Sequence, residues 1–254
     1  MIRAALASAL ILALASALPA AAQDRPAGPP EREATGRGSL RGYANPSAVI
    51  AAELALDRDA GARGEQLALS AAAAPQAVVF TPRLVWAQAS MKNRAAALPA
   101  RRWNPTAVWS SCDGALVLAR SDWTGPGGPG WLARIWQRQP GGAYKWLVTL
   151  SGTGGLQQAE PDMIAAQVAD CPPARRRPDD DDDEARGRHK PKPPKPSKAL
   201  PTLDPLHHSG ASPDGSLRWD GRVEAGDAPH LVVSWRKDGA DNVLFDRQVA
   251  AGPR

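Results

Sequence analysis

Histidine and cysteine are scarce in this sequence, and their scarcity limits the chemistry that the chain can perform. The 254 residues include four histidines and two cysteines, and residues 1–188 contain no histidine. A serine or cysteine nucleophile usually needs a neighbouring histidine base, so a hydrolase of that kind is disfavoured. Asp204, His207 and His208 are close in sequence, but adjacent histidines point in different directions on most backbones. We therefore predict no catalytic residue, no metal site and no cofactor.

Long apolar runs are absent after residue 22, which argues against later membrane spans. Near the N-terminus, Arg3 precedes an apolar run at residues 4–18, and Pro19 leads into three alanines before Gln23. This order is typical of a cleaved secretory signal peptide, and a run of about 15 residues is shorter than the roughly 20 that span a bilayer. We expect a periplasmic or secreted protein with no membrane span.

The two cysteines are Cys112 and Cys171. Oxidising compartments favour the pairing of an even number of thiols, so export predicts one disulfide between them. The alternative is that each cysteine is a small buried hydrophobic residue.

The chain carries an excess of positive charge, with a formal net charge of +5 and a pI near 9.6. Nucleic-acid-binding proteins gather such charge on one face, whereas the arginines here are scattered along the sequence. Export also separates the protein from nucleic acid, so we expect no nucleic-acid partner. A basic surface would suit anionic lipid head groups or polysaccharide, and the sequence does not select between them.

Composition divides the chain into six segments. Residues 172–212 are the most distinctive, because they contain five consecutive aspartates and a lysine–proline alternation, with no large apolar residue before Leu200. The predicted segments are a signal peptide (1–22), a flexible lead-in (23–45), helices and a meander sheet (46–155), a short helical segment (156–171), a disordered charged insert (172–212) and C-terminal strands that complete the same domain (213–254).

Helical and strand patterns alternate within the ordered segments. Asn45 and Pro46 are typical of a helix start, and Asp113-Gly114 between two alternating runs is a strong hairpin signal. Predicted helices cover 46–60, 62–74, 85–94 and 160–168. Predicted strands cover 78–80, 103–111, 115–123, 131–139, 144–150, 216–223, 230–235 and 242–249. Short turns make the four strands of 103–150 an antiparallel meander.

Several motifs in residues 46–150 resemble a known family. They are the stretch Ala48–Ala55, the segment Ala77–Pro82, the motif Val108–Gly114, and Ile135–Gln139 together with Tyr144-Lys145-Trp146. In these motifs the chain is similar to exported DUF4440 or SnoaL-like proteins of proteobacteria, in the NTF2-like superfamily. The resemblance implies an α+β fold, an NTF2-like cone with helices packed on a strongly curved antiparallel sheet, here with a disordered insert before the last strands.

The resemblance leaves the activity open, because the superfamily includes isomerases, cyclases and many proteins without known activity. Glu53 and Asp57 lie one helical turn apart, and we expect them to form a solvated face rather than a catalytic pair. A carboxylate base beside a proton donor, which a cone isomerase requires, is not apparent in residues 78–111.

Tryptophan is the one abundant aromatic residue, with nine copies against two tyrosines and two phenylalanines. Most of the tryptophans are expected to pack in the core, and the alternative is a role in stacking on a ligand. The leading hypothesis is a non-enzymatic protein with a pocket for a small apolar or aromatic ligand. Its expected lining is Trp86, Trp109, Trp136 and Tyr144.

Two other hypotheses remain open. One is an enzyme of the SnoaL or ketosteroid-isomerase type, and the other is an interaction protein that acts through its charged insert. A homodimer is compatible with each of them.

Overall fold

A computed structural model describes residues 44–92, 101–154, 163–173 and 200–250. All of them belong to one compact unit of the chain. The predicted signal peptide, most of the lead-in, residues 156–162 and the insert from 174 to 199 lie outside the described residues. Within the described part, no helix is both long enough and apolar enough to cross a membrane.

The described residues form three helices: α1 (Pro46–Arg63), α2 (Glu65–Ala72) and α3 (Ala87–Met91). The Asn45 side chain caps α1 by accepting a hydrogen bond of 3.3 Å from the backbone N–H of Ala48, and Pro46 occupies the first turn. Gly64 ends α1 with a φ of 95°, a conformation that favours glycine. Helix α1 buries Val49, Leu56 and Ala60 against the sheet.

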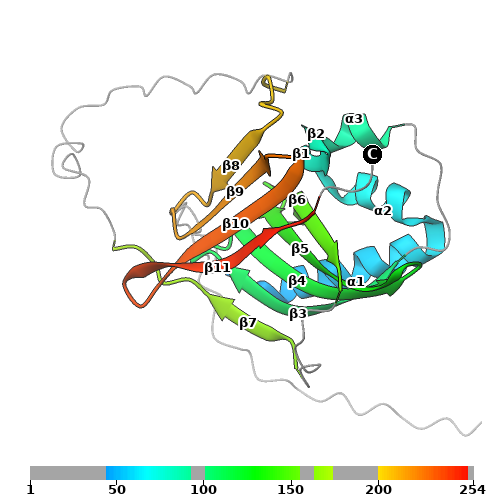
Figure 1. Ribbon diagram of the computed structural model, residues 1–254. Coiled ribbons are helices and arrows are strands. Elements are labelled where there is room, and N and C mark those ends of the chain that lie inside the picture. The colour runs from blue at the N-terminus through cyan, green and yellow to red at the C-terminus, as the bar shows by residue number, and fades with distance from the viewer. Residues whose placement is uncertain (1–43, 93–100, 155–162, 174–199, 251–254) are drawn as a thin grey trace, which may run out of the picture. The chain divides into compact units, whose positions relative to one another are not determined.

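The first sheet has seven strands in the order β2-β1-β6-β5-β4-β3-β7 (Figure 1). Its strands are β1 (Ala73–Thr81), β2 (Arg83–Trp86), β3 (Arg102–Ser110), β4 (Leu116–Gly125), β5 (Gly128–Arg138), β6 (Tyr144–Thr153) and β7 (Ala165–Val168). Strands β3 to β6 form the predicted antiparallel meander, which is confirmed. Two pairs, β1 with β6 and β3 with β7, are parallel, so the sheet is mixed.

The second sheet is antiparallel and has four strands in the order β11-β10-β9-β8. Its strands are β8 (His207–Ala211), β9 (Leu217–Glu224), β10 (Ala228–Lys237) and β11 (Ala240–Gln248). The three C-terminal strands expected from the sequence are thus present, and β8 is an additional strand that the sequence analysis did not predict.

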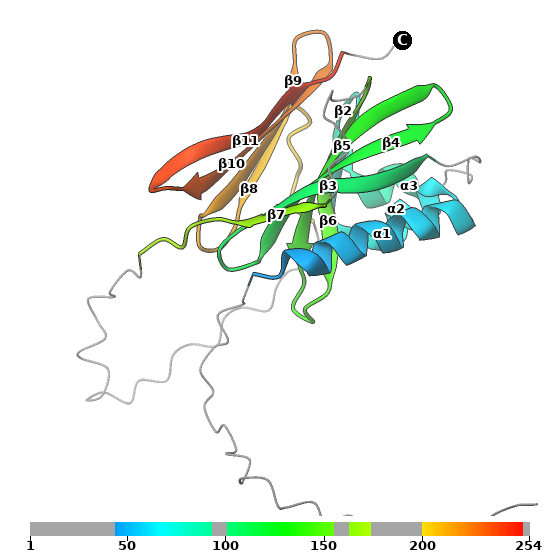
Figure 2. The ribbon, with the colours of Figure 1, turned by 90° about the horizontal axis from the view of Figure 1, so that it is seen from below.

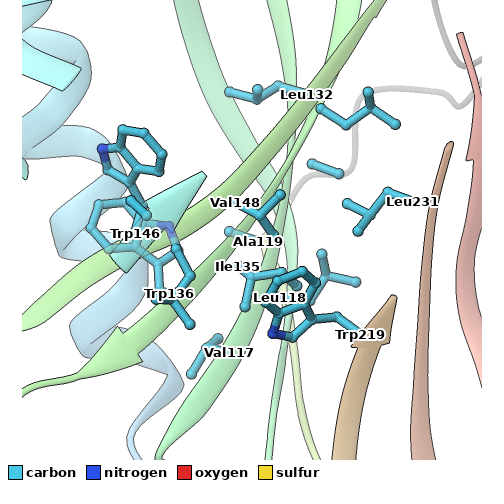
Figure 3. Packing of buried hydrophobic residues seen from close by; sticks show 14 of the residues in the cluster. Val117, Leu118, Ala119, Leu132, Ile135, Trp136, Trp146, Val148, Trp219 and Leu231 are labelled. Carbon is cyan, nitrogen blue, oxygen red and sulfur yellow. The ribbon is translucent and has the colours of Figure 1, made fainter. Parts of the chain in front are cut away.

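The two sheets and the helices form layers (Figure 2). The indoles of Trp136 and Trp146 lie on the helix side of the first sheet, whereas Leu118 and Ile135 lie on the side that meets the second sheet (Figure 3). Trp131 of β5 packs edge-on against Phe245 of β11, with 5.5 Å between the ring centroids. The first sheet is therefore covered on both faces.

The expected fold class is wrong. The chain does not form an α+β NTF2-like cone with helices on a strongly curved antiparallel sheet, because it consists mainly of strands in two sheets and the larger sheet is mixed. The C-terminal strands build a second sheet, and its Trp219 and Leu231 lie against the first sheet (Figure 3). The parallel pairs join segments that are distant in sequence, and no short turn signals them.

Two local predictions are wrong as well. The predicted helix at 85–94 begins instead with strand β2, and only Ala87–Met91 is helical. The predicted helix at 160–168 is strand β7 over its last four residues. Each segment contains two alanines, which favour helices, but pairing with the neighbouring strands β1 and β3 decides their backbone conformation.

The predicted disulfide is confirmed, since Cys112 and Cys171 are bonded with 5.1 Å between their Cα atoms. Cys112 follows β3 and Cys171 follows β7. The bond therefore reinforces the parallel contact between these two strands, next to the backbone hydrogen bond of 2.8 Å from Ala169 N–H to the carbonyl of Ser110.

Two hairpin turns share the pattern Ser-x-Asp-Gly-x-Leu, one at residues 111–116 and the other at residues 212–217. In each turn the serine hydroxyl donates 2.6 Å to the aspartate carboxylate, and the glycine has a positive φ. The two turns also bind one another. Asp113 N–H donates 2.8 Å to the Asp214 carboxylate, and Asp214 N–H donates 3.2 Å to the Asp113 carboxylate. We call these reciprocal bonds the twin-turn contact.

Candidate functional site

A buried ion pair joins α1 to the first sheet. The Glu53 carboxylate is fully buried and accepts hydrogen bonds from the Arg134 guanidinium, from Trp136 Nε1 at 2.7 Å and from Trp103 Nε1 at 3.1 Å. The guanidinium carbon of Arg134 lies 5.3 Å from the ring centroid of Trp103 and 5.8 Å from that of Trp136. Two indoles thus donate to the anion and also contact the cation.

The environment of this pair accounts for its stability. Burial lowers the pKa of Arg134, because the charged guanidinium loses water, and the neighbouring Glu53 carboxylate opposes that shift. Further hydrogen bonds offset the cost of burying such a pair, and here the two indole N–H groups supply them for Glu53, whereas Arg134 Nε is buried without a hydrogen-bond partner among the described residues. The expectation that Glu53 and Asp57 form a solvated face is wrong, since both carboxylates are buried.

Asp57 lies one turn after Glu53 and holds the start of β3. It accepts hydrogen bonds of 2.6 Å from Arg102 Nη2 and 2.9 Å from the backbone N–H of Trp103. Burial raises the pKa of Asp57, but these hydrogen bonds outweigh burial, so the pKa lies below its ordinary value. Trp103 is therefore fixed twice, through its backbone by Asp57 and through its indole by Glu53.

A cleft of about 410 Å³ opens beside Asp57 at the start of β3. It is lined by Asp57, Arg102, Trp103, Asn104, Pro105, Thr106, Asp122, Thr124 and Ile164. Cross-strand register brings β3 and β4 together here, with Asn104 opposite Asp122 and Arg102 opposite Thr124. Residues of α1, β3, β4 and the segment before β7 thus share one hollow.

The lining of this cleft mixes hydrogen-bonding and apolar groups. Asp122 carries a carboxylate, Asn104 an amide, and Thr106 and Thr124 hydroxyls, of which that of Thr106 donates 3.2 Å to the carbonyl of Arg120. Pro105 and Ile164 add apolar surface. Such a set suits a small molecule with several hydroxyl groups and short apolar C–H faces.

A second hollow of about 480 Å³ lies across β8, β9 and β10. It is lined by Ser209, Gly210, Ala211, Arg218, Trp219, Asp220, Val232 and Ser234. Small side chains form most of this lining, so the hollow offers fewer directed hydrogen-bonding groups than the cleft beside Asp57. At its margin His207 Nε2 lies 2.8 Å from the Asp220 carboxylate.

The four residues expected to line an apolar pocket make separate contacts in the structure. Trp136 belongs to the buried Glu53 cluster, and Trp86 packs edge-on against His208 with 5.7 Å between ring centroids. The guanidinium carbon of Arg120 lies 6.0 Å from the ring centroid of Trp109. Tyr144 donates 2.7 Å to the carbonyl of Gly114, and burial raises its pKa. None of the four lines either hollow in the part of the chain that the structure describes, and their ligand role stays a prediction.

Arg134, Arg102 and the cleft residues of β4 were not predicted as site residues from the sequence. A signal for the first was present: Arg134 lies within the strongly apolar run Trp131–Trp136, and a cation inside a buried strand requires a buried anion. Glu53 lies one turn from the apolar Val49 and Leu56 and was the available partner. The cleft carries no comparable signal, because it depends on the pairing of β3 with β4 beside α1.

Metal binding receives no support from clustering, since the described residues contain no group of three or more histidine, cysteine, aspartate or glutamate side chains placed to hold an ion. Comparisons with protein-family models, with curated protein sequences and with solved structures found no match. The resemblance to exported DUF4440 or SnoaL-like proteins therefore stays a prediction.

Proposed function

We propose that this chain is an exported, non-catalytic protein that binds a small polyhydroxylated ligand, such as a mono- or disaccharide, in the cleft beside Asp57. The observation that carries the proposal is a cleft of about 410 Å³ in which a carboxylate, an amide and two hydroxyls meet apolar surface. Saccharides present both hydroxyl groups and C–H faces, so this lining is complementary to them.

The rigidity of the cleft wall supports a binding role. Arg102 and Trp103 are held by Asp57, and Trp103 is held again by the buried Glu53. A wall held in this way loses little conformational entropy when a ligand binds. The proposed ligand class differs from the apolar one expected from the tryptophans, because the four expected lining residues border neither of the two hollows described above.

Export to the periplasm or beyond is part of the proposal. The N-terminal sequence has the order of a secretory signal, and the Cys112–Cys171 disulfide suits an oxidising compartment. Free and polymer-derived saccharides occur in such compartments, and the protein would meet its ligand there.

The test is titration of the folded protein with a panel of free mono- and disaccharides, followed in two-dimensional NMR by the indole N–H signal of Trp103. Trp103→Phe identifies that signal. Asn104→Ala and Thr124→Val change exposed cleft residues, and each should weaken binding about 2- to 10-fold, the loss of one hydrogen bond. Ser209→Ala is the matched control, because Ser209 is exposed in the second hollow and should leave affinity unchanged.

Two outcomes would contradict the proposal. One is the absence of any saccharide in the panel that shifts the Trp103 signal. The other is equal binding by the native protein, Asn104→Ala and Thr124→Val, which would place the ligand elsewhere. Indole, added as an aromatic probe, separates the polar ligand class from the apolar class that the sequence suggested.

A further inference from the structure

One tryptophan lies near the cleft beside Asp57 without lining it. Trp109 of β3 is half-buried, as is Trp86, whereas the other seven of the nine tryptophans are buried. Trp86 packs edge-on against His208 of the second sheet. A half-buried indole keeps part of its apolar ring in contact with water, and a ligand can cover that part.

Strand register places Trp109 on the same face of the first sheet as the cleft. Asn104 and Asp122, which line the cleft, are opposite one another on β3 and β4, and Trp109 is opposite Leu118. Directly opposite residues point to the same face of a sheet, and so do alternate residues of one strand. Asp122 and Leu118 are four positions apart on the regular strand β4, so their partners on β3 share a face, although β3 carries a bulge between them.

Arg120 lies between the cleft and this indole. It occupies the position midway between Asp122 and Leu118 on β4, and its guanidinium carbon is 6.0 Å from the ring centroid of Trp109. The hydroxyl of the cleft residue Thr106 donates 3.2 Å to the backbone carbonyl of Arg120. A cation at this distance is attracted to the ring and restricts its orientation. Contacts along one pair of strands therefore join the cleft to the indole.

Strand β7 borders Trp109 on its other side. Gln167 pairs with Trp109 in parallel register, and Ile164, three residues earlier, lines the cleft. The side chains of Asn104, Thr124 and Gln167 are exposed, so this part of the sheet is open to solvent. An amide beside an indole offers a hydrogen bond to a hydroxyl group and an apolar surface to a C–H face. The position at Trp109 thus combines the same two kinds of group as the cleft.

We propose that the saccharide cleft continues along β3 and β4 to a second sugar subsite at Trp109, so that the ligand is a disaccharide or a longer chain. This inference rests on the proposed binding of a saccharide in the cleft. Asp122 and Leu118, which mark the two positions on β4, are about 13 Å apart along the strand. One hexose ring is shorter than this span. A monosaccharide in the cleft therefore leaves the indole uncovered, and a second ring reaches it.

The two positions contribute differently to recognition. Directed hydrogen bonds from Asn104, Asp122 and Thr124 orient the first sugar in the cleft. The face of an indole is electron-rich and apolar, so it suits the C–H face of a pyranose ring. The indole contributes only when a second sugar is present. Loss of the Trp109 ring should therefore weaken the binding of disaccharides and leave that of monosaccharides unchanged.

The experiment titrates the folded full chain with matched sugars. Glucose, galactose and N-acetylglucosamine are compared with cellobiose, lactose and chitobiose, and two-dimensional NMR follows the indole N–H signals of Trp103 in the cleft wall and of Trp109. Trp109→Phe identifies the second signal. Dissociation constants are measured for the native protein, Trp109→Ala and Trp109→Phe. Trp86→Ala is the matched control, because Trp86 is also half-buried and does not line the cleft.

At least one disaccharide should shift both indole signals, whereas its monosaccharide shifts only that of Trp103. Trp109→Ala should weaken binding of that disaccharide about 3- to 10-fold and leave monosaccharide binding unchanged. Trp109→Phe, which keeps an aromatic ring, should retain most of the disaccharide affinity, and Trp86→Ala should retain all of it.

Disaccharide binding that shifts the Trp103 signal but not the Trp109 signal would overturn the subsite and leave the proposed function standing. A shift of the Trp109 signal alone would also overturn it, because the ligand would not continue from the cleft. If none of the six sugars shifts either signal, the proposed function is contradicted for this panel and the subsite fails with it. The two signals are read in the native protein, so this decision does not depend on the stability of any variant.

Discussion

Strand β5 of the first sheet and strand β9 of the second both lie between two neighbours, yet they bury their side chains differently. Residues 130–136 of β5 are buried without interruption, whereas β9 alternates buried Leu217, Trp219 and Gly221 with exposed Arg218 and Arg222. A strand covered on both faces has no exposed side, and a strand covered on one face shows alternation with a period of two. The burial pattern thus shows that the first sheet is covered on both faces and the second sheet on one.

Charged residues follow the same division. The first sheet holds the Arg134–Glu53 pair, whose side chains are 2% and 0% exposed. The second sheet holds the Arg218–Asp241 pair on its outer face, 3.6 Å apart, with both side chains more than half exposed. A buried charge that loses its partner is costly, whereas an exposed pair exchanges its contacts with water. Substitutions in the two sheets should therefore have very different effects.

The largest effect is expected for Glu53→Gln. It leaves Arg134 charged and buried without an anion, and we expect the free energy of unfolding to fall by about 3–5 kcal/mol. Asp241→Asn in the second sheet is the control and should cost less than about 1 kcal/mol. Urea unfolding measures both. A loss below about 1 kcal/mol for Glu53→Gln would show that the buried pair is not what distinguishes the first sheet.

A smaller effect is expected where glycines allow an indole to cross a strand. A Cβ at Gly130 of the first sheet would overlap the backbone of Gly152 and the ring of Trp123, and one at Gly210 of the second sheet would lie 2.7 Å from Trp219 Nε1. We expect Gly130→Ala to lower the free energy of unfolding by about 3 kcal/mol, because the overlap includes the backbone of a neighbouring strand, which shifts little. We expect Gly210→Ala to lower it by about 1–2 kcal/mol, because Gly210 lies on the edge strand β8 and meets only a side chain.

Thermal unfolding of the two alanine variants provides the measurement. Gly141→Ala is the control, since a Cβ there meets no atom within 4 Å and its φ is not positive, so it should change stability by less than about 0.5 kcal/mol. Equal losses at Gly130 and Gly210 would mean that the edge strand β8 is as rigid as the centre of the first sheet.

The smallest effects are expected from pH, and two histidines of the second sheet should act in opposite directions. Burial lowers the pKa of His208, which packs between Trp86 and Trp219, and the neighbouring His207 adds to that shift. Its contribution to stability is present above the unfolded pKa of about 6.5 and is lost as the pH falls through the lower folded value. His230 has a raised pKa, mainly because Asp246 accepts a hydrogen bond from it, with Glu224 adding to the shift.

The contribution of His230 is therefore present below about pH 6.5 and is lost as the pH rises through its higher folded value. The difference in melting midpoint between the native protein and His230→Gln should shrink as the pH rises from about 5 to about 8. The corresponding difference in melting midpoint for His208→Gln should grow as the pH rises over the same range. Parallel curves for the two variants would contradict these assignments.

Local features of the fold were predictable from the sequence. The Asp113-Gly114 turn, the short glycine-rich turns after β4 and β5, and the cap at Asn45 each depend on a few adjacent residues, and each appears in the structure. The disulfide was predictable because only one pairing of two cysteines exists. Such features do not depend on which distant segments of the chain pack together.

The layers and the cleft were not predictable in this way. Glu53 looked like part of an exposed acidic stripe because its partners, Arg134, Trp103 and Trp136, are at least 50 residues away. Strand β8 consists of His207–Ala211, which has no large apolar residue and no alternation to mark it as a strand. The tryptophans suggested one pocket, but the residues expected to line it border neither of the two hollows among the described residues.

The meander and its turns followed from the amino-acid sequence because short connections allow only antiparallel neighbours, and the disulfide was predicted because export favours pairing of the two cysteines. Packing between distant segments, in contrast, makes the C-terminal strands a second layer, brings β1 and β7 into the first sheet in parallel, and buries Glu53. The physical reason is that each of these outcomes depends on which apolar face covers another. Apolar attraction has no direction, so the choice among faces is made by the packing of the whole chain.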